Sequence, residues 1–281
     1  MPEITFSCDV EDPRPDERHP KRYPEIIEGL LARLEVLDIK GTFFFVGEVA
    51  KADPELVRKT AALGHEIGFH SMYHKPLTIQ STIEFEEETR AGKQLLEDIS
   101  ATPVVGYRAP TFSLTRQSLW AVDILQDLEF KYSSSVLPAG NPLFGLPGTP
   151  FTPFRWHNGL LELPVPLASI CGTKTPFLGG VYFRYLPNRL IKFFLKKAPQ
   201  DHCLWTYCHP YDFDAEQPFY RMKETTLWVS WLLWLNRKRT FSKFEGLLKI
   251  SPAISFAPPF SEQLDLGRFD QVPGLPMTPF T

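Results

Sequence analysis

The stretch from residue 3 to residue 47 reads as a strand, a helix and a second strand: EITFSCDV (3–10), YPEIIEGLLARLEVLD (23–38) and GTFFFVG (41–47). Isoleucine and leucine recur through the middle segment at helical spacing. The alternation continues, with strands predicted at 66–70 and 104–110 and helices at 52–64, 81–100 and 115–128. Repeated strand–helix units favour a parallel sheet, and the length available favours a TIM-like α/β barrel over an open sheet.

The second half of the chain is less regular. Candidate strands are FKYSSSV (130–136), LLELPVP (160–166) and CLWTYCHP (203–210), and a GGVYFR segment lies between the last two at 179–184. Beyond residue 216 the sequence contains a tryptophan-rich helical stretch, followed from residue 258 by a proline-rich tail that we expect to wrap the surface. The 27 prolines of the chain agree with many loops rather than long bundled helices.

The composition excludes several classes of protein. The chain has 281 residues, of which 43% are apolar and 22% charged, as in a soluble globular protein. A formal net charge of −3 provides no basic field for nucleic acid. The N-terminus, MPEITFSCDVED, lacks the basic and apolar regions of a secretory signal, so we expect a cytoplasmic protein with reduced cysteines. No apolar run approaches the ~18–20 residues that span a bilayer.

Titratable side chains stand at the carboxyl ends of predicted strands, where barrel enzymes carry catalytic groups. Asp9 and Glu11 share a face if the first strand continues, which suggests one metal ligand and one general base. In GHEIGFHSMYH (64–74), His70 and His74 are four residues apart, and a helix starting there lets both bind one metal. Taken alone, the acids also fit a salt-bridged loop, and the histidines a hydrogen-bonded pair.

Two further strand ends carry candidate groups. Arg108 in YRAPTF (107–112) can clamp a carboxylate, and the backbone N–H of Thr111 is free to act as an oxyanion donor. His209 in YCHPYDFD (207–214) can donate a proton at neutral pH. Each group alone is more often structural. Together, acids, histidines and an arginine that converge on one barrel mouth indicate an active site.

These motifs, in this order, resemble the NodB-homology polysaccharide deacetylases of carbohydrate esterase family four. The resemblance runs from about residue 3 to about residue 215 and rests on GTFFFVGEVA, GHEIGFHSMYH, GYRAPTFSLT, GGVYFR and HPYDFD. It is greatest to the exopolysaccharide-locus branch, whose C-terminal extension residues 216–257 resemble. It implies a distorted TIM-like (β/α) barrel of about seven strands over residues 1–215, with residues 216–281 packed on it as an extension.

The resemblance also implies one divalent metal, usually zinc, and assigns residues to it. Asp9 matches the catalytic base, and His70 and His74 match the two metal-binding histidines. The family's usual pair of adjacent aspartates is spaced here as Asp-x-Glu. Glu11 is therefore the expected third ligand, and Asp12 is held in reserve.

The remaining roles follow from the same resemblance. Arg108 matches the arginine that orients the base, and His209 matches the general acid. Relatives often carry an aspartate where this chain has Ser133. The group that orients His209 therefore stays open between Asp212 and Asp214.

The implied reaction is metal-assisted hydrolysis that removes an N-acetyl group from a sugar and releases acetate. A cytoplasmic enzyme of this kind meets nucleotide-linked sugars, lipid-linked saccharides or glycans at the inner face of the membrane. Aromatic side chains are expected in the mouth to hold the sugar ring, and the candidates are Phe112, Tyr182, Tyr207 and Tyr211.

Two segments indicate a peripheral membrane contact. LPNRLIKFFLKK (186–197) is basic and amphipathic, and TLWVSWLLWLNRKR (226–239) joins three tryptophans to a basic cluster. The commoner arrangement is that both are helices packed on the barrel. Two other functions also stay open: an amidohydrolase of a small cyclic amide or ureide, and a carbohydrate-binding protein without catalysis. The sequence does not indicate an oligomeric state.

Overall fold

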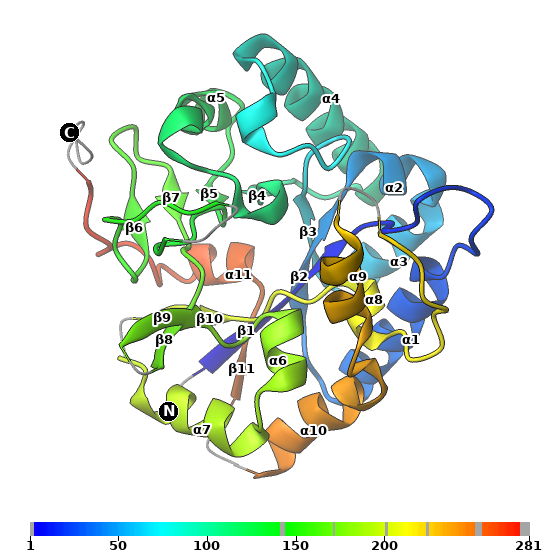
Figure 1. Cartoon of the computed structure of the whole chain (residues 1–281). Helices are drawn as coiled ribbons and strands as arrows, with labels where there is room; N and C mark the ends of the chain where they lie inside the picture. Colours follow the sequence, from blue (N-terminus) through cyan, green and yellow to red (C-terminus); the bar gives the residue numbers. More distant parts are fainter. Residues whose placement is uncertain are drawn as a thin grey trace.

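Strand β1 (Glu3–Val10) lies inside the main sheet and is buried from its second residue onward. From β10 the sheet runs through β1, β2, β3, β4, β5 and β7, each parallel to the next, and ends with β6 antiparallel to β7. It curls into an open barrel with helices around its outside (Figure 1). These seven parallel strands confirm the predicted α/β barrel. The computed structural model describes residues 3–140, 144–170, 172–199, 202–222, 225–250 and 255–275.

The first half follows the predicted alternation of strands and helices. Helix α4 (Thr82–Ser100) begins where the sequence indicates, because the Ser81 hydroxyl accepts the backbone N–H of Glu84. The prediction missed a short helix, α2 (Gly47–Ala52), which has no side-chain cap to announce it. The other elements of this half are β2 (Gly41–Phe45), β3 (Glu66–Phe69), β4 (Gly106–Tyr107), β5 (Tyr132–Ser133), α1 (Tyr23–Val36), α3 (Pro54–Ala62) and α5 (Trp120–Asp127).

Shorter elements build the second half. A separate antiparallel hairpin of β8 (Leu167–Ile170) and β9 (Thr173–Pro176) was not predicted. The segment beyond residue 216 contributes β11 (Ser255–Ala257), which pairs with the first residues of β1. The remaining elements are β6 (Phe154–Arg155), β7 (Leu161–Glu162), β10 (Leu204–Trp205), α6 (Gly180–Tyr185), α7 (Asn188–Lys197), α8 (Pro210–Phe213), α9 (Leu227–Trp234), α10 (Thr240–Ile250) and α11 (Phe260–Asp265).

Part of the proline-rich tail lies inside the barrel, so the prediction that it wraps the surface was wrong there. Phe260, at the start of α11, is fully buried against the rings of Tyr132 and Trp205. Its backbone N–H donates to the Thr42 hydroxyl at 3.3 Å, near the amino end of β2. Phe260 is buried although the sequence around it resembles a loop, because its ring fills the base of the barrel and its apolar surface is thereby removed from water.

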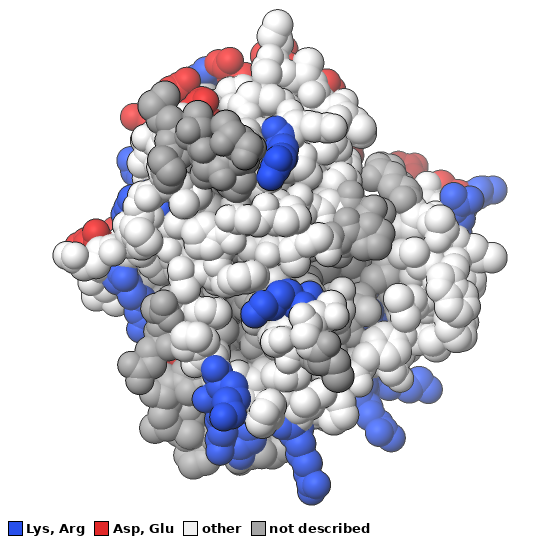
Figure 2. All heavy atoms as spheres, turned by 60° about the vertical axis from the view of Figure 1, so that its left-hand side comes forward, with Lys and Arg blue, Asp and Glu red and all other residues white. Residues whose placement is uncertain are grey.

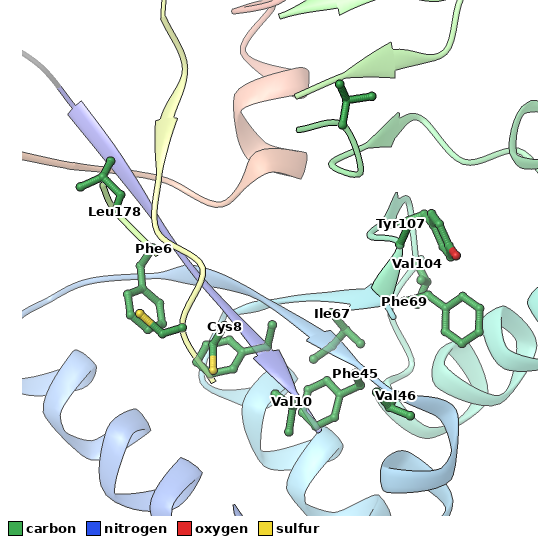
Figure 3. Close-up of a cluster of buried hydrophobic side chains, with 14 of the residues drawn as sticks. Phe6, Cys8, Val10, Phe45, Val46, Ile67, Phe69, Val104, Tyr107 and Leu178 are labelled. Carbon is green, nitrogen blue, oxygen red and sulfur yellow. The ribbon is translucent and has the colours of Figure 1, made fainter. Parts of the chain in front are cut away.

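The two-residue period of β1 points its side chains to two different cores. Phe6, Cys8 and Val10 lie in the cluster that also holds Phe45 and Ile67 (Figure 3). The alternate residues face the barrel interior, where a second apolar cluster includes Phe44, Tyr132, Trp205 and Phe260. This alternation aims Asp9 into the barrel at the carboxyl end of β1.

Two further expectations concern the chain as a whole. Within the described residues, no helix is both long and apolar enough to cross a bilayer. Cys8, Cys203 and Cys208 carry free thiols, and Cys171 lies outside the described residues.

Candidate active site

Three potential metal ligands converge at the carboxyl ends of β1 and β3. One ligand atom each from Glu11, His70 and His74 lies within 4.8 Å of the others. Two imidazoles and one carboxylate are a donor set that catalytic zinc sites use, so the residues fit the predicted metal. The sequence suggested that the two histidines share one face of a helix, but the structure has no helix there. They lie on a loop in which Ser71 and His74 have φ values of 66° and 54°.

The tautomer of His70 suits a metal ligand. Its Nδ1 lies 2.8 Å from the backbone carbonyl oxygen of Arg108, which can only accept a hydrogen bond. The proton therefore sits on Nδ1, and Nε2 keeps its lone pair. The side chain is 2% exposed, and burial lowers the pKa of His70 to about 4, so the ring is neutral at pH 7.

Glu11 rather than Asp12 joins the histidines. Glu11 Oε2 lies 2.7 Å from His74 Nε2. Burial alone raises the pKa of Glu11, but the charge and hydrogen bond of His74 and the charge of His209 lower it to about 2. Asp12 is instead held by Arg14, whose Nη2 lies 2.6 Å from Asp12 Oδ2. The reserve ligand is therefore bound elsewhere, while Glu11 stays an anion facing the histidines.

Asp9 is a buried carboxylate with its two oxygens in different surroundings. Oδ1 accepts a hydrogen bond from Arg108 Nη1 at 2.6 Å. Oδ2 lies 4.0 Å from His70 Nε2 and 4.0 Å from His209 Nε2. The arginine thus fixes one oxygen and leaves the other facing both imidazoles, as a base that takes a proton beside the ligand cluster requires.

The guanidinium of Arg108 is held by aromatic rings and hydroxyl groups as well as by Asp9. It is fully buried, lies 4.0 Å from the ring centroid of Phe44 and 4.4 Å from that of Trp205, and bonds Ser7 and Ser134 through its two Nη atoms. A charge confined between two rings cannot follow a moving partner. The position of Asp9 is therefore set by the barrel interior.

His209 is the fifth titratable group of the mouth and is supported by side chains. Its Nδ1 lies 3.0 Å from Asp212 Oδ2, and its ring stacks on Tyr211 at 4.7 Å. Asp212 Oδ1 lies 3.0 Å from Nε of Arg184, and neither side chain of that pair is exposed. Burial lowers the pKa of His209, but the Asp212 hydrogen bond and the charges of Glu11, Asp212 and Asp9 raise it to about 9.

The structure thus answers which aspartate orients His209. It is Asp212, whereas Asp214 binds Arg22 through a 2.5 Å contact from Nε. Sequence reasoning missed Arg184 and Gly180. A Cβ on Gly180 would lie 1.9 Å from Asp212 Oδ2, so only glycine admits the carboxylate there. The sequence did contain a signal for both residues, because GGVYFR has two adjacent glycines and a charged residue beside aromatic ones.

The position where relatives often carry an aspartate is occupied differently. Ser133 donates to the Ser135 hydroxyl at 2.8 Å. A buried acid, Glu162 on the neighbouring β7, accepts the backbone N–H groups of Ser135 and Val136 at 2.7 and 2.9 Å. Burial raises the pKa of Glu162. This acid serves the strand exit and does not contact His209.

The predicted oxyanion donor and sugar-binding residues lie around the same mouth. Thr111 is exposed, with φ 55°, and its hydroxyl donates to the Pro110 carbonyl at 2.6 Å. Phe112 is half-buried and contacts the ring of Tyr207 at 5.0 Å. Tyr182 is also half-buried, but Tyr207 and Tyr211 are buried. Their roles toward a substrate stay predictions, and only Phe112 and Tyr182 expose much ring surface to one.

Comparison with known proteins connects this geometry to a family. A model described as polysaccharide deacetylase matches residues 16–132, and one described as a domain of unknown function (DUF3473) matches residues 134–257. His70, His74 and Arg108 lie in the first segment, and His209 lies in the second. The boundary predicted at residue 215 stays a prediction.

Curated relatives match over short segments. A peptidoglycan-N-acetylglucosamine deacetylase of Bacillus cereus is 36% identical over 70 residues, which are 25% of this chain and 26% of the relative. A chitooligosaccharide deacetylase of Rhizobium leguminosarum bv. trifolii is 32% identical over 87 residues, 31% of this chain and 38% of the relative. The matches therefore span well under half the length of either relative.

Solved structures share the fold at low sequence identity. A Mycobacterium smegmatis protein assigned to the polysaccharide deacetylases superposes with a TM-score of 0.68 at 18% identity, over 98% of this chain and 93% of the other. An allantoinase superposes with a TM-score of 0.62 at 14% identity, over 99% and 92%. At these identities the likeness concerns the fold alone. Residues 16–132 therefore match the polysaccharide deacetylase family, and residues 134–257 match the DUF3473 domain.

Proposed function

We propose that this chain is a metal-dependent hydrolase that removes the N-acetyl group from a sugar of a glycan and releases acetate. The observation that carries the proposal is the cluster of Glu11, His70 and His74, with Asp9 on one side and His209 beside it. The family match and the relatives' names support an acetylated saccharide as the substrate.

The ligand cluster and Asp9 supply water activation. A divalent cation bound by Glu11, His70 and His74 supplies Lewis acidity and lowers the pKa of water, and zinc suits this donor set. Asp9 Oδ2 faces the cluster and accepts the proton of the attacking water. Arg108 keeps the other Asp9 oxygen fixed, so the base does not turn away. The predicted oxyanion donor is the backbone N–H of Thr111.

His209 supplies the proton that the leaving group needs. A pKa of about 9 keeps its ring protonated at pH 7. Asp212 engages Nδ1, which leaves the Nε2 proton available on the side facing Asp9. When the amide C–N bond breaks, this proton goes to the sugar nitrogen, and the products are an amino sugar and acetate.

Acetate release from N-acetylated chitooligosaccharides tests the proposal, with Asp9→Asn as the matched inactive variant. We expect acetate from the wild type, metal bound in both proteins, and turnover lost in the variant. Release of acetate by Asp9→Asn at the wild-type rate would remove the base assignment. Allantoin in a parallel assay tests the ureide alternative, because turnover of allantoin with no acetate from any sugar would replace the deacetylase proposal.

A substrate panel addresses the finer class of saccharide. Free oligosaccharides, nucleotide-linked N-acetyl sugars and lipid-linked N-acetyl sugars differ only in what lies beyond the acetylated ring. The aglycone that lowers KM most identifies the class. A cytoplasmic location stays the prediction made from the sequence.

A further inference from the structure

Helix α9 is apolar nearly all round and exposes large apolar side chains to solvent. Its one polar residue, Ser230, is fully buried and bonds the backbone N–H of Met222 at 3.0 Å. Five apolar residues of the same helix are exposed instead. They are Leu227, Trp228, Val229, Trp231 and Leu232, with exposed fractions of 61%, 70%, 36%, 42% and 37%, and we call them the α9 ridge.

The α9 ridge is an ordered surface. Trp228 and Trp231 stack on each other at 5.2 Å with their planes 21° apart. The backbone carbonyl oxygen of Leu232 accepts the hydroxyl of Tyr185, which is itself 38% exposed. The neighbouring carbonyl of Leu233 accepts Arg184 Nη1 at 2.9 Å. Hydrogen bonds from α6 therefore fix the helix that presents the tryptophans.

Helix α7 provides the contrast, although its sequence is also amphipathic. It buries Ile191, Phe194 and Leu195 in the core, as a packing helix does. Only Phe193 among its large apolar residues is strongly exposed. Of these two helices, α9 is therefore the one that exposes most of its large apolar residues.

Basic residues lie at both ends of the α9 ridge. Arg221 is exposed and donates through Nε to the Thr225 carbonyl just before the helix. Lys238 and Arg239 follow it and are exposed, and between Glu224 and Glu245 the sequence has no Asp or Glu. The nearest described acid before the helix, Glu216, lies 3.8 Å from Arg22. Lys and Arg also gather along the lower edge of Figure 2, at the height of α7 and α10 in Figure 1.

We propose that the α9 ridge inserts into the surface of an anionic lipid bilayer. Tryptophans favour the boundary between headgroups and acyl chains, leucines extend below it, and flanking cations contact anionic headgroups. A sugar-binding platform needs aromatic faces beside polar groups, whereas this surface combines its rings with aliphatic residues and exposes no polar residue of the helix. The flanking positive charges and the apolar α9 ridge together fit an anionic lipid surface better than they fit a sugar.

The position of α9 places that bilayer beside the catalytic mouth. The helix packs on α8, which starts immediately after His209. Arg237, after α9, lies 5.2 Å from the ring of Tyr211, which stacks on His209. A bilayer at the α9 ridge thus holds the mouth close to saccharides carried on the membrane surface.

Co-sedimentation of the full chain with vesicles tests this inference independently of any enzymatic activity. The probes are vesicles of phosphatidylcholine alone and of phosphatidylcholine mixed with phosphatidylglycerol. We expect binding to the mixed vesicles, and a loss of about tenfold or more in Trp228→Ser/Trp231→Ser. Lys238→Gln/Arg239→Gln should weaken binding to mixed vesicles by about fivefold per charge and leave binding to neutral vesicles unchanged.

The matched control is Ile83→Ser, because Ile83 on α4 is 69% exposed and lies outside the α9 ridge. It should bind vesicles as the wild type does. No sedimentation of the wild type with mixed vesicles would overturn the inference, as would an equal loss in the control. If the wild type is a dimer that binds no vesicles, and Trp228→Ser/Trp231→Ser is a monomer, a second copy of the chain covers the ridge. If Trp228→Ser/Trp231→Ser instead has a higher KM for a soluble glycan than the wild type, the ridge binds sugar.

Discussion

The two sides of the catalytic mouth are held in different ways. In the first half, the N–H of His70 donates to the Phe45 carbonyl of the neighbouring strand at 2.9 Å, and Asp9 is fixed by Arg108, which is confined by the rings of the barrel interior. In the second half, His209 depends on a chain of side chains through Asp212 to Arg184. The side that activates water is therefore preset by the barrel. The side that carries His209 is tunable, because substitutions at its supporting residues can change the position and the pKa of His209 in steps.

The largest effect is expected on the preset side. Asp9→Asn keeps the hydrogen bond from Arg108 possible but removes the base, so kcat should fall by about 10²- to 10⁴-fold. Metal content should stay unchanged, because Asp9 is not in the ligand cluster. Steady-state kinetics and elemental analysis of the same preparation check both halves of this expectation. Loss of the metal together with activity would contradict the separation of base from ligands.

The base of the barrel should affect stability rather than chemistry. Phe260→Ala leaves a cavity among Tyr132 and Trp205 beside the amino end of β2, whereas Asp9 lies at the carboxyl end of β1. We expect the free energy of unfolding to fall by about 3–5 kcal/mol. Denaturant unfolding measures this change. Activity well below the unfolding transition should match the wild type, and a selective loss of activity in a fully folded variant would contradict the assignment.

On the tunable side, Asp212→Asn should change the pH dependence. His209 must be protonated to act, so activity falls on the alkaline side as pH rises through its pKa of about 9. Removing the Asp212 charge and its strong hydrogen bond lowers that pKa, and the alkaline limb moves to lower pH. We also expect kcat at pH 7 to drop by about tenfold to a hundredfold. An unmoved alkaline limb in a kcat–pH profile would show that Asp212 does not tune the acid.

Gly180→Ala tests the same side with a smaller change. The new Cβ meets the Asp212 carboxylate, and the shift should reach His209 as a partial loss of activity of about tenfold and a small movement of the alkaline limb. The matched control is Gly29→Ala in α1, where a Cβ meets nothing within 4 Å. That variant should keep full activity and gain about 0.5–1 kcal/mol of stability. Equal activities of the two variants would remove the positioning role of Gly180.

Much of the first half could be predicted because local and long-range signals agree there. β1 was predicted at its observed bounds, since a continuous apolar run needs only burial to become a strand. Asp9, Glu11, Arg108 and His209 were located through their places at strand ends. His70 and His74 were paired correctly, but on the wrong local structure, because their spacing cannot reveal a loop with two left-handed residues.

Features that depend on three-dimensional contacts could not be predicted from the sequence. Phe260 fills the barrel from a segment whose prolines indicate a loop, and its role depends on the space left by distant strands. Arg184, on α6, is buried between the Leu233 carbonyl of α9 and Asp212, which lie far from it in the sequence. The outward side of α9 was also hidden, since a helix that is apolar all round does not show which side it buries.

Metal content of the purified full chain tests the central claim most directly. The account predicts that wild-type protein, prepared without chelator, holds a single divalent ion per chain. His70→Ala/His74→Ala and Glu11→Ala should lose it, and Asp12→Asn should keep it, because Asp12 is bound by Arg14. Protein that holds no divalent ion even after incubation with zinc, or an ion retained by the histidine variant, would contradict the account.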